Sequence, residues 1–461
     1  MKFIADFHLH SKYSRATSPQ MDLENLDKWA KIKGIKVLGT GDFTHPEWFK
    51  NLKEKLEPAE PGLYRLKSEI RNSKSETNSK PEHKTRFCAR PSTYIYVPWF
   101  QILNSKDETR FILTSEISCI YSKKGKVRKV HILIFAPDFE TVEKINTHLS
   151  WIGNLKADGR PILGLDVKEL VKIVLNISEN CFIVPCHLMT PWFSLFGSKS
   201  GFDSIEECFE EYSKYIFAGE TGLSADPKML WRMPDGRRIT LISNSDAHSA
   251  PHIGREANVF EGDEINYNNI INAIKQGPKS NIQYPKSNIK LIYTIEFFPQ
   301  EGKYHYDGHR ICGISCSPNQ TKKYNGICPV CGKSLTIGVL NRIEQLADRE
   351  EGFKPENTIP FKSLIPLEEL IAESLGVGVG TKEVEREYKN LIEKFGNEFE
   401  ILLNSSCQDL QGQSRPEIVE GIKRLREGKL FIEPGYDGVY GKIRIFSKGE
   451  QEIPLRQKTL F

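Results

Sequence analysis

The sequence predicts an α/β fold, either a barrel or a doubly wound sheet, in which helices pack on mostly parallel strands. Two observations predict this fold. Short β-rich runs alternate with amphipathic runs through the first half of the chain, and histidines and carboxylates recur where the predicted strands end. Because α/β folds place their active sites at the carboxyl ends of the strands, the second observation supports the first.

The predicted elements follow one another in a regular order. Strands are expected at 2–9, 35–40, 110–116, 130–135, 181–185, 215–220, 239–243 and 289–298, with helices at 23–33, 142–155, 167–177 and 266–276. Later, apolar residues at helical spacing predict helices at 367–375 and 383–395. The turn GVGVGT at 376–381 joins them and either caps the first helix or offers backbone N–H groups to a phosphate. Residues 433–446 predict a turn and a strand.

Length and composition limit the class of protein. The chain has 461 residues, of which 39% are hydrophobic and 27% charged, and this excludes a wholly disordered chain, a collagen or a coiled coil. No apolar run approaches the roughly 20 residues of a membrane helix. Asp6 and His8 interrupt the N-terminal segment too early for a signal peptide, and the ten cysteines, four clustered and six scattered, fit a reducing cytosol. A net charge of +4 is too balanced to indicate nucleic-acid binding by itself.

One segment departs from the regular pattern. Residues 65–90 carry eight lysines and arginines against three glutamates, with serine, asparagine and proline between them. The segment is either a solvated loop inserted into the fold or a basic arm that contacts phosphates, and the two interpretations are compatible.

The strongest chemical signal is a set of metal-ligand residue types. Asp6, His8 and His10 alternate along the first strand and so share one face, while Asp42 ends the second strand and His45 follows it. Later strands contribute Glu116, His131, His187, Asp246 and His248. Nitrogen and oxygen ligands without thiolates suit Zn²⁺, Mn²⁺ or Fe²⁺. Because the set exceeds what one ion can use, we expect two or three ions bridged by Glu116, a cluster that activates water and binds phosphate oxygens.

These motifs resemble the PHP (polymerase and histidinol phosphatase) superfamily. The resemblance rests on DFHLHS, on the aspartate after the second strand, on the isolated Glu and His, and on NSDAHS. Longer strings resemble the endonuclease Q family within it: EPGLYRLKSEI, HLMTPWFSLFGSKSGFDSIEEC, GETGLSADPKMLWRMP and SDAHSAPHIGREAN, together with the cysteine cluster. The resemblance covers nearly the whole chain and implies a distorted seven-stranded β/α barrel with a trinuclear metal site.

The resemblance also implies an activity. It predicts a metal-dependent endodeoxyribonuclease for DNA repair, which hydrolyses the phosphodiester 5′ to deaminated bases (uracil, hypoxanthine, xanthine) and abasic sites. A metal-activated hydroxide would leave a 3′-hydroxyl and a 5′-phosphate. The partner is then damaged DNA, the location the cytoplasm (nucleoid-associated), and the cofactors two or three divalent ions (Zn, Mn, Mg or Fe).

Carried over by motif, the metal ligands are His8, His10, Asp42, Glu116, His131, His187, Asp246 and His248. Glu116, His187 and Asp246 are expected to be catalytic. The superfamily usually has Thr-Asp-His where this chain has Thr40-Gly41-Asp42, so Asp42 takes the histidine's place. Another histidine usually follows the first motif and is missing here, which leaves the third metal position open and His45 as a candidate substitute.

A nuclease for damaged bases must unstack the base before it can read the base edge. The segment after His187 combines aromatic side chains with serines and a lysine. The predicted DNA contacts are Trp192, Ser198, Lys199, Ser200 and Arg255. The alternatives are that the aromatic residues belong to the core at the barrel rim and that Arg255 is a structural ion-pair partner.

Two features lie outside the catalytic region. Cys312, Cys316, Cys328 and Cys331 form a C-x3-C-x11-C-x2-C pattern, which favours one structural zinc over a redox pair or an Fe–S site. At the C-terminus, Gln457, Leu460 and Phe461 resemble the short peptides that dock on sliding clamps, so a clamp is an expected partner.

We therefore predict three domains: a catalytic PHP domain at 1–300 with a basic insertion at about 52–109, a four-cysteine zinc module at 301–345, and a helical C-terminal domain at 346–461 that ends in the clamp-binding tail. One alternative function is a PHP phosphatase or exonuclease for another phosphoester. The other is a non-catalytic, clamp-associated DNA-binding scaffold, against which the nearly complete ligand set argues.

Overall fold

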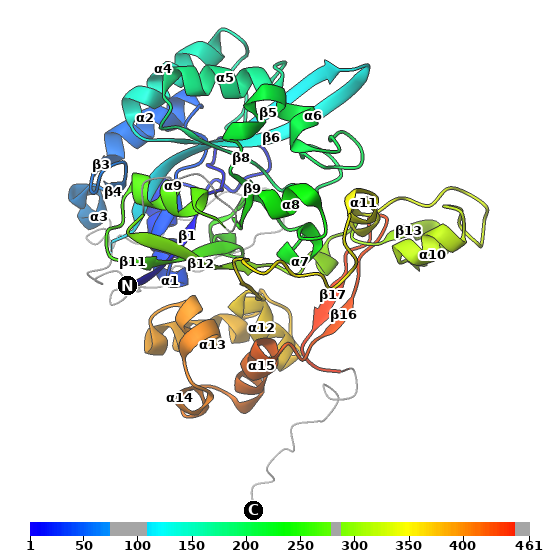
Figure 1. Cartoon of the computed structure of the whole chain (residues 1–461). Coiled ribbons are helices and arrows are strands. Elements are labelled where there is room, and N and C mark those ends of the chain that lie inside the picture. The colour runs from blue at the N-terminus through cyan, green and yellow to red at the C-terminus, as the bar shows by residue number, and fades with distance from the viewer. Residues whose placement is uncertain (74–107, 278–286, 448–461) are drawn as a thin grey trace, which may run out of the picture.

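A computed structural model describes residues 1–73, 108–277 and 287–447 of the chain. The described part is a mixed α/β body with a projecting small module and a helical C-terminal region (Figure 1). The predicted α/β class and the helical C-terminal region are therefore confirmed. The predicted clamp-binding residues Gln457, Leu460 and Phe461 and most of the basic segment lie outside the described residues.

The body is built on one large branched sheet. Its strands are β1 (Lys2–Asp6), β2 (Val37–Gly39), β3 (Leu56–Pro58), β4 (Tyr64–Leu66), β5 (Arg110–Lys123), β6 (Lys126–Ala136), β7 (Ile162–Leu163), β8 (Phe182–Pro185), β11 (Ala257–Gly262), β12 (Ile289–Glu296) and β15 (Phe361–Ser363). The main order is β15-β12-β11-β1-β2-β5-β4-β3, and β6, β7 and β8 branch from β5. β1, β2 and β5 are parallel, but β11 and β6 run antiparallel to their neighbours, so the sheet is mixed.

The strands β5 and β6 are much longer than the sequence predicted. They form a hairpin that turns at Lys124 and Gly125, both with positive φ (51° and 74°), as a tight two-residue turn requires. Glu116 and His131, expected at strand ends, therefore lie within the two strands.

A predicted closed barrel is not confirmed. Strands β9 (Ala218–Glu220) and β10 (Thr240–Ile242) form a separate parallel pair beside the main sheet. Single backbone hydrogen bonds connect this pair to its neighbours: Leu188 N donates to Glu220 O (2.9 Å), and His10 N donates to Ala247 O (3.0 Å). Among the described residues, the β9–β10 pair therefore forms no continuous strand pairing with the main sheet on either side. We call these two interruptions seams; the isolated hydrogen bonds cross them beside the predicted ligands.

Helices cover the outside of the sheet (Figure 1). They are α1 (Leu23–Lys33), α2 (Pro46–Lys55), α3 (Ser68–Ser73), α4 (Phe139–Ser150), α5 (Val167–Ile177), α6 (Ile205–Phe209), α7 (Pro227–Leu230), α8 (Pro234–Arg238) and α9 (Tyr267–Lys275). Short 3₁₀ turns occupy 210–215, 250–252, 299–301 and 310–312. Capping explains the predicted bounds of α1, because the Asp22 carboxylate accepts from Asn25 N and Gly34 ends the helix at φ 87°. Asp138 likewise starts α4 earlier than predicted.

A row of phenylalanines fills the space between the strands. Phe7, Phe135, Phe182 and Phe260 are each at most 1% exposed. Phe7 contacts Phe135 and Phe260 with ring centroids 5.4 and 6.1 Å apart, in edge-to-face arrangements. Since Phe7 directly precedes His8, this core fixes the chain at the point where the first predicted ligand begins.

The small module and the C-terminal region follow the body. The module contains β13 (Asp307–His309), β14 (Ile314–Cys316), α10 (Pro318–Lys323) and α11 (Val339–Leu346). The C-terminal region contains α12 (Leu367–Leu375), α13 (Lys382–Phe395), a π-helical turn at 400–404, α14 (Cys407–Gln411), α15 (Pro416–Glu427), β16 (Phe431–Glu433) and β17 (Lys442–Arg444). Gly376 caps α12 at φ 65°, so the glycine-rich turn performs the capping role that one interpretation predicted.

A buried ion pair joins the C-terminal helices to the body. Lys33 Nζ at the end of α1 lies 2.7 Å from Glu398 Oε2, and both side chains are about 5% exposed. Tyr388 OH donates to the same carboxylate, and Leu367 N donates to its other oxygen. Because a buried charge pair is costly to separate, the helical region is held in a defined position. No helix in the described parts of the chain is long and apolar enough to span a membrane.

Candidate metal centre

Six predicted ligands meet at one end of the sheet. His8 and His10 follow β1, Glu116 lies in β5, His131 lies in β6, His187 follows β8, and Asp246 follows β10. All are buried except Asp246, whose side chain is 26% exposed. The sequence positions of these residues span most of the body, so the fold alone brings them together.

The first group contains His8, His10, Glu116 and Asp246, whose ligand atoms lie within 4.8 Å of one another. His10 Nε2 is 3.1 Å from Asp246 Oδ1 and 3.2 Å from Glu116 Oε2. His8 Nε2 is 3.7 and 3.6 Å from the same two oxygens. Three of these buried atoms, His8 Nε2, His10 Nε2 and Asp246 Oδ1, have no hydrogen-bond partner in the described structure.

The second group contains Glu116, His131 and His187. Glu116 turns its other oxygen to this group: Oε1 is 2.7 Å from His131 Nδ1 and 3.1 Å from His187 Nε2. The two imidazole nitrogens are 3.3 Å apart. Glu116 therefore has one oxygen in each group, as expected of a carboxylate that bridges two ions.

The donor set fits divalent metal ions. Buried polar atoms without partners are costly unless a ligand satisfies them, and here they converge on one point. Four imidazoles and two carboxylates, with no thiolate among them, suit Zn²⁺, Mn²⁺ or Fe²⁺. The two groups share Glu116.

Two further carboxylates orient the first pair of histidines. Asp42 Oδ1 is 3.0 Å from His10 Nδ1, and both Glu220 oxygens are 3.0 Å from His8 Nδ1. Such contacts fix the tautomer and leave the opposite nitrogen, Nε2, free to bind an ion. Burial opposes the charge on Asp42, but the adjacent His10 and the Ser11 hydrogen bonds lower its pKa below the usual value.

Asp42 lies outside the two candidate groups. It was expected among the ligands, but its oxygens accept hydrogen bonds from His10, Ser11 N (2.6 Å) and the hydroxyls of Ser11 (2.7 Å) and Ser14 (2.9 Å). Asp42 therefore stands behind His10 rather than beside Glu116.

The two remaining histidine predictions do not join either group. His248 Nδ1 donates to Asp246 O (2.9 Å), and the His248 ring lies 4.5 Å from that of His10. His45 precedes α2 and stacks on Tyr13 with ring centroids 4.4 Å apart, although its buried Nδ1 has no described hydrogen-bond partner. Neither histidine belongs to the one further candidate group that the described side chains form beside these two, which contains His8, Cys186 and Glu220.

Sequence reasoning missed Cys186, Glu220 and Arg160. Glu220 ends β9, so the rule that found the other carboxylates at strand ends applies to it as well. Arg160 lies in the loop before β7, and its Nη1 is 3.1 Å from Glu116 Oε2. No sequence pattern marked Arg160, because the loop reaches the site only through a close approach: a Cβ on Gly159 would lie 2.3 Å from Asp42 Oδ2.

The backbone is strained where it presents these side chains. Asp42, His187 and Asp246 all have positive φ, at 47°, 30° and 47°. Residues with side chains rarely adopt this conformation, and it persists where the surrounding structure enforces it, often at active sites. Gly222 provides the space for His187, since a Cβ there would lie 2.5 Å from His187 Cβ.

The predicted DNA contacts occupy different environments. Trp192 is 50% exposed, and Ser198 and Lys199 are exposed beside it. Ser200 is buried, where its hydroxyl donates to Lys129 O and accepts from Phe193 N. Arg255 donates from Nε to Ser245 O (3.0 Å) and so supports the loop that carries Asp246. Ser200 and Arg255 therefore have hydrogen-bond partners within the fold.

The cysteine module brings together three of its four predicted ligands. Cys312, Cys328 and Cys331 lie within ligand distance of one another, and the fourth member of the group is His309, whose Nδ1 is 3.5 Å from Cys331 Sγ. Cys316, at the end of β14, packs beside Cys328 and Leu335 instead. Burial raises the pKa of the Cys328 thiol, but the N–H groups of Cys331 and Val330 bring it down to about 7, which favours a thiolate ligand.

Comparison with protein families gives two partial matches. Residues 235–278 match the family model described as PHP-associated. Residues 366–429 match the model described as the MJ0043 C-terminal domain. The first match includes Asp246 and His248, and the second covers most of the C-terminal helices.

Two relatives are known from sequence. The chain is 38% identical over 275 residues to the uncharacterized protein MJ0043 of Methanocaldococcus jannaschii, a match to 58% of this chain and 31% of that protein. It is 28% identical over 340 residues to the uncharacterized protein YqxK of Bacillus subtilis, covering 73% and 79%. The chain thus spans about a third of the length of the archaeal relative.

Two solved structures are similar along nearly the whole chain. The lesion-specific endonuclease PfuEndoQ from Pyrococcus furiosus matches with a TM-score of 0.78 and 28% identity over 96% of this chain and 95% of its own. A structure of endonuclease Q in complex with a 27-mer duplex bearing an abasic lesion matches with a TM-score of 0.77 and 27% identity over 99% of both chains. The resemblance predicted from the sequence motifs is confirmed.

Proposed function

We infer that this chain, which has the fold of endonuclease Q and the metal-binding groups of a PHP phosphodiesterase, is a metal-dependent DNA repair endonuclease. We propose that it cleaves the phosphodiester 5′ to deaminated bases and abasic sites and leaves a 3′-hydroxyl and a 5′-phosphate. The observation that carries the proposal is the pair of metal-binding groups joined by Glu116 within a fold that matches endonuclease Q over 96% of the chain.

The residues of the site have different proposed roles: some would bind the ions, and others orient the histidines. His8, His10 and Asp246 would hold one ion, His131 and His187 the other, and Glu116 both. Ions bound there supply an activated water and neutralise charge on phosphate oxygens. Asp42 and Glu220 keep the Nε2 atoms of His10 and His8 directed at the ion.

The mouth of the site indicates where the scissile phosphate lies. Asp246 and Arg160 are the partly exposed members of the centre, with side chains 26% and 24% exposed. We propose that the phosphate enters beside them, where the Arg160 guanidinium faces its oxygens. Arg160 also neutralises part of the Glu116 charge, which would otherwise repel the phosphate.

The other parts of the chain support this proposal. We propose that Cys312, Cys328 and Cys331 hold one structural zinc with His309, and that Cys316 packs against the site. We also propose three domains at 1–300, 301–345 and 346–461, of which the last contributes β15 (Phe361–Ser363) to the sheet of the first. We propose that the exposed Trp192, Ser198 and Lys199 contact DNA.

A cleavage assay tests the proposed function. A 5′-labelled duplex with a single deoxyuridine, deoxyinosine or abasic site is incubated with the chain and Mg²⁺, Mn²⁺ or Zn²⁺. We expect one product that ends directly 5′ to the lesion, absent with undamaged DNA and with Asp246→Asn. Cleavage that ignores the lesion, or hydrolysis restricted to a small phosphoester such as p-nitrophenyl phosphate, would favour a general PHP exonuclease or phosphatase instead.

A further inference from the structure

A basic groove opens beside the metal centre. It has a volume of about 770 Å³, within the roughly 300–1,000 Å³ of sites that enclose small ligands. One wall is the exposed end of the β5–β6 hairpin, the second is the loop 192–201, and the third is Arg342 of α11. Three segments far apart in sequence therefore form it.

The groove lies next to the second candidate metal-binding group. His131 N donates to Phe193 O (3.1 Å), and the rings of these two residues lie 4.9 Å apart. Lys129 Nζ lies 5.1 Å from the Phe193 ring and 5.2 Å from the ring of Trp192. Phe193 is thus a neighbour both of a candidate metal ligand and of a lysine that lines the groove.

The charged side chains of the groove are either paired within the fold or unpaired. Its acids are neutralised within the fold, because Glu207 pairs with Arg128 (3.1 Å) and Asp203 pairs with Arg342 (2.6 Å). Lys126, Lys129 and Lys199 form no ion pair with any described residue. Three lysines therefore give the groove a positive charge that the fold leaves uncompensated, a feature that attracts a polyanion.

Trp192 adds a stacking surface to this charge. Its side chain is 50% exposed, although Lys129 lies over the ring. The face of a base is accessible to such a ring only when the base is unpaired or out of the stack. Lysines that follow a phosphate backbone and an aromatic ring that stacks on bases together characterise sites for single-stranded nucleic acid.

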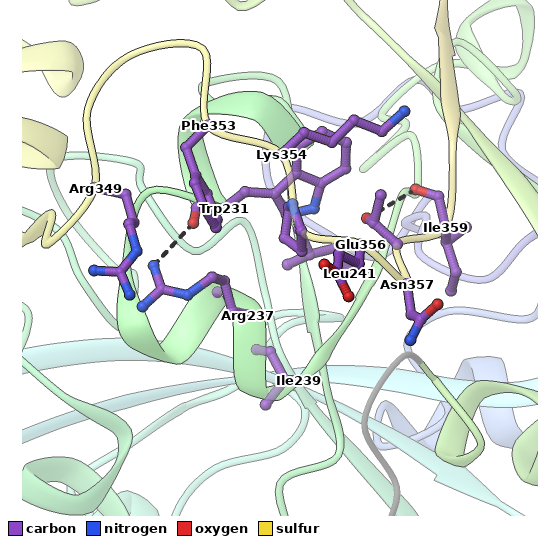
Figure 2. Close-up of a pocket in the computed structure, with 13 residues that line it drawn as sticks. Trp231, Arg237, Ile239, Leu241, Arg349, Phe353, Lys354, Glu356, Asn357 and Ile359 are labelled. Atoms are coloured by element: carbon purple, nitrogen blue, oxygen red, sulfur yellow. Dashed lines mark hydrogen bonds between the residues drawn. The ribbon is translucent and has the colours of Figure 1, made fainter.

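Another cavity does not share these features. It has a volume of about 500 Å³ and lies beneath the segment 349–359 (Figure 2). Its Arg237 is held by both oxygens of Asp348, each at 2.7 Å, and by Trp231 O. The charge of Arg237 is thus neutralised by Asp348 within the fold.

We propose that the groove binds an unpaired stretch of the DNA strand next to the scissile phosphate, with one base stacked on Trp192 and the phosphates held by Lys126, Lys129 and Lys199. The proposal rests on the proposed function and specifies it: the enzyme holds opened DNA, not only the lesion itself. Lys126 and Lys129, which the sequence did not indicate, come from the hairpin that extends beyond its predicted length.

Binding without cleavage tests this inference separately from the activity. The full chain is titrated with a fluorescent oligothymidylate in EDTA, and anisotropy gives the affinity. Trp192→Ala should weaken binding on the order of 5- to 150-fold, and Trp192→Phe should restore most of it. The double variant Lys126→Ala/Lys199→Ala should reduce the slope of log affinity against log salt by about 1.4.

Matched controls come from the same chain. Trp151 is 74% exposed and lies outside the groove, and Lys144 and Lys172 lie on the outer helices α4 and α5. Trp151→Ala and Lys144→Ala/Lys172→Ala should bind the oligonucleotide as the unmodified chain does, and thermal melting checks that every variant is folded. If Trp192→Ala binds normally, or Trp151→Ala is equally impaired, the inference is wrong. A chain that binds the single strand but cleaves no damaged duplex would instead overturn the proposed function.

Discussion

The two halves of the proposed metal centre, one with His8, His10 and Asp246 and the other with His131 and His187, use the same ligand type but support it differently. In the first half, the rear nitrogens, by which we mean the ring nitrogens that face away from the ion position, are the Nδ1 atoms of His8 and His10. They contact the carboxylates of Glu220 and Asp42. In the second half, the rear nitrogens contact hydroxyls: His131 Nε2 is 3.1 Å from Ser118 Oγ, and His187 Nδ1 is 2.7 Å from Thr190 Oγ1. A carboxylate partner makes an imidazole a stronger base and ligand than a hydroxyl partner does.

The pKa directions agree with this difference. Burial disfavours the charged form of His8 and His10, yet Glu220 and Asp42 raise the pKa of each well above its usual value. Burial lowers the pKa of His131 to about 4, even though Glu116 is adjacent. We therefore expect the first half to hold its ion tightly and the second half to bind a more exchangeable ion.

The largest effect should follow from removing the shared ligand. Glu116→Gln leaves a neutral side chain where one oxygen served each half, so both ion positions lose their common charge. We expect no detectable cleavage and, by elemental analysis of the purified chain, at most one bound ion in the two-ion centre. Retention of two ions with full activity would show that Glu116 does not bridge.

Changing the supports compares the halves directly. Asp42→Asn replaces the carboxylate behind His10 with an amide and should lower metal affinity or activity by about 10- to 100-fold. Ser118→Ala removes the hydroxyl behind His131 and should have a smaller effect, because less basicity is lost. Isothermal titration with Mn²⁺ measures both variants, and equal losses would remove the distinction between the halves.

The same comparison shows what the sequence could predict. The six candidate ligands could be predicted because histidines and carboxylates rarely gather at buried strand ends unless they bind an ion or each other. The helices α1 and α5 could be predicted from their periodicity and caps. The supporting contacts were not identifiable in this way. Whether Asp42 binds an ion or stands behind His10 depends on the backbone at φ 47°, and Arg160 reaches Glu116 through tertiary packing alone.

The cysteine module repeats this lesson. Its spacing predicted a metal site, but the choice between Cys316 and His309 as fourth ligand depends on how β13 and β14 pair, with His309 opposite Ile314. Likewise, the predicted barrel depended on closure of the sheet, and the described strands form no continuous ladder across the seams beside β9 and β10, where isolated backbone hydrogen bonds and side-chain contacts make the connection. The local sequence pattern predicts the helices and strands, whereas the pairing of strands far apart in sequence determines the fourth ligand of the module and whether the sheet closes.

Graded removal of metal should separate the halves in order. As a chelator such as EDTA is titrated into the metal-loaded chain, the ion in the half supported by Ser118 and Thr190 should leave first. Activity should then fall with loss of the first ion, while thermal stability falls mainly with the second, since that ion satisfies the partnerless Nε2 atoms of His8 and His10. Simultaneous loss of both ions would contradict the predicted difference in affinity.

The smallest effect concerns a buried acid next to the carboxylate-supported half. Glu296 Oε2 accepts from Thr221 Oγ1 (2.8 Å), one residue after Glu220, and burial raises the pKa of Glu296 to about 8 from its ordinary 4.5. The folded chain thus binds this proton more tightly than the unfolded chain, so the stabilisation is complete below about pH 4.5 and is lost as the pH rises through about 8.

Glu296→Gln should flatten the decline in melting temperature between about pH 5 and pH 9, with a change on the order of 2 °C. The conservative Glu301→Gln, at a partly buried acid whose pKa burial raises to about 7, is the matched comparison outside this half of the centre. A pH profile that is the same in Glu296→Gln as in the unmodified chain would contradict the raised pKa of Glu296.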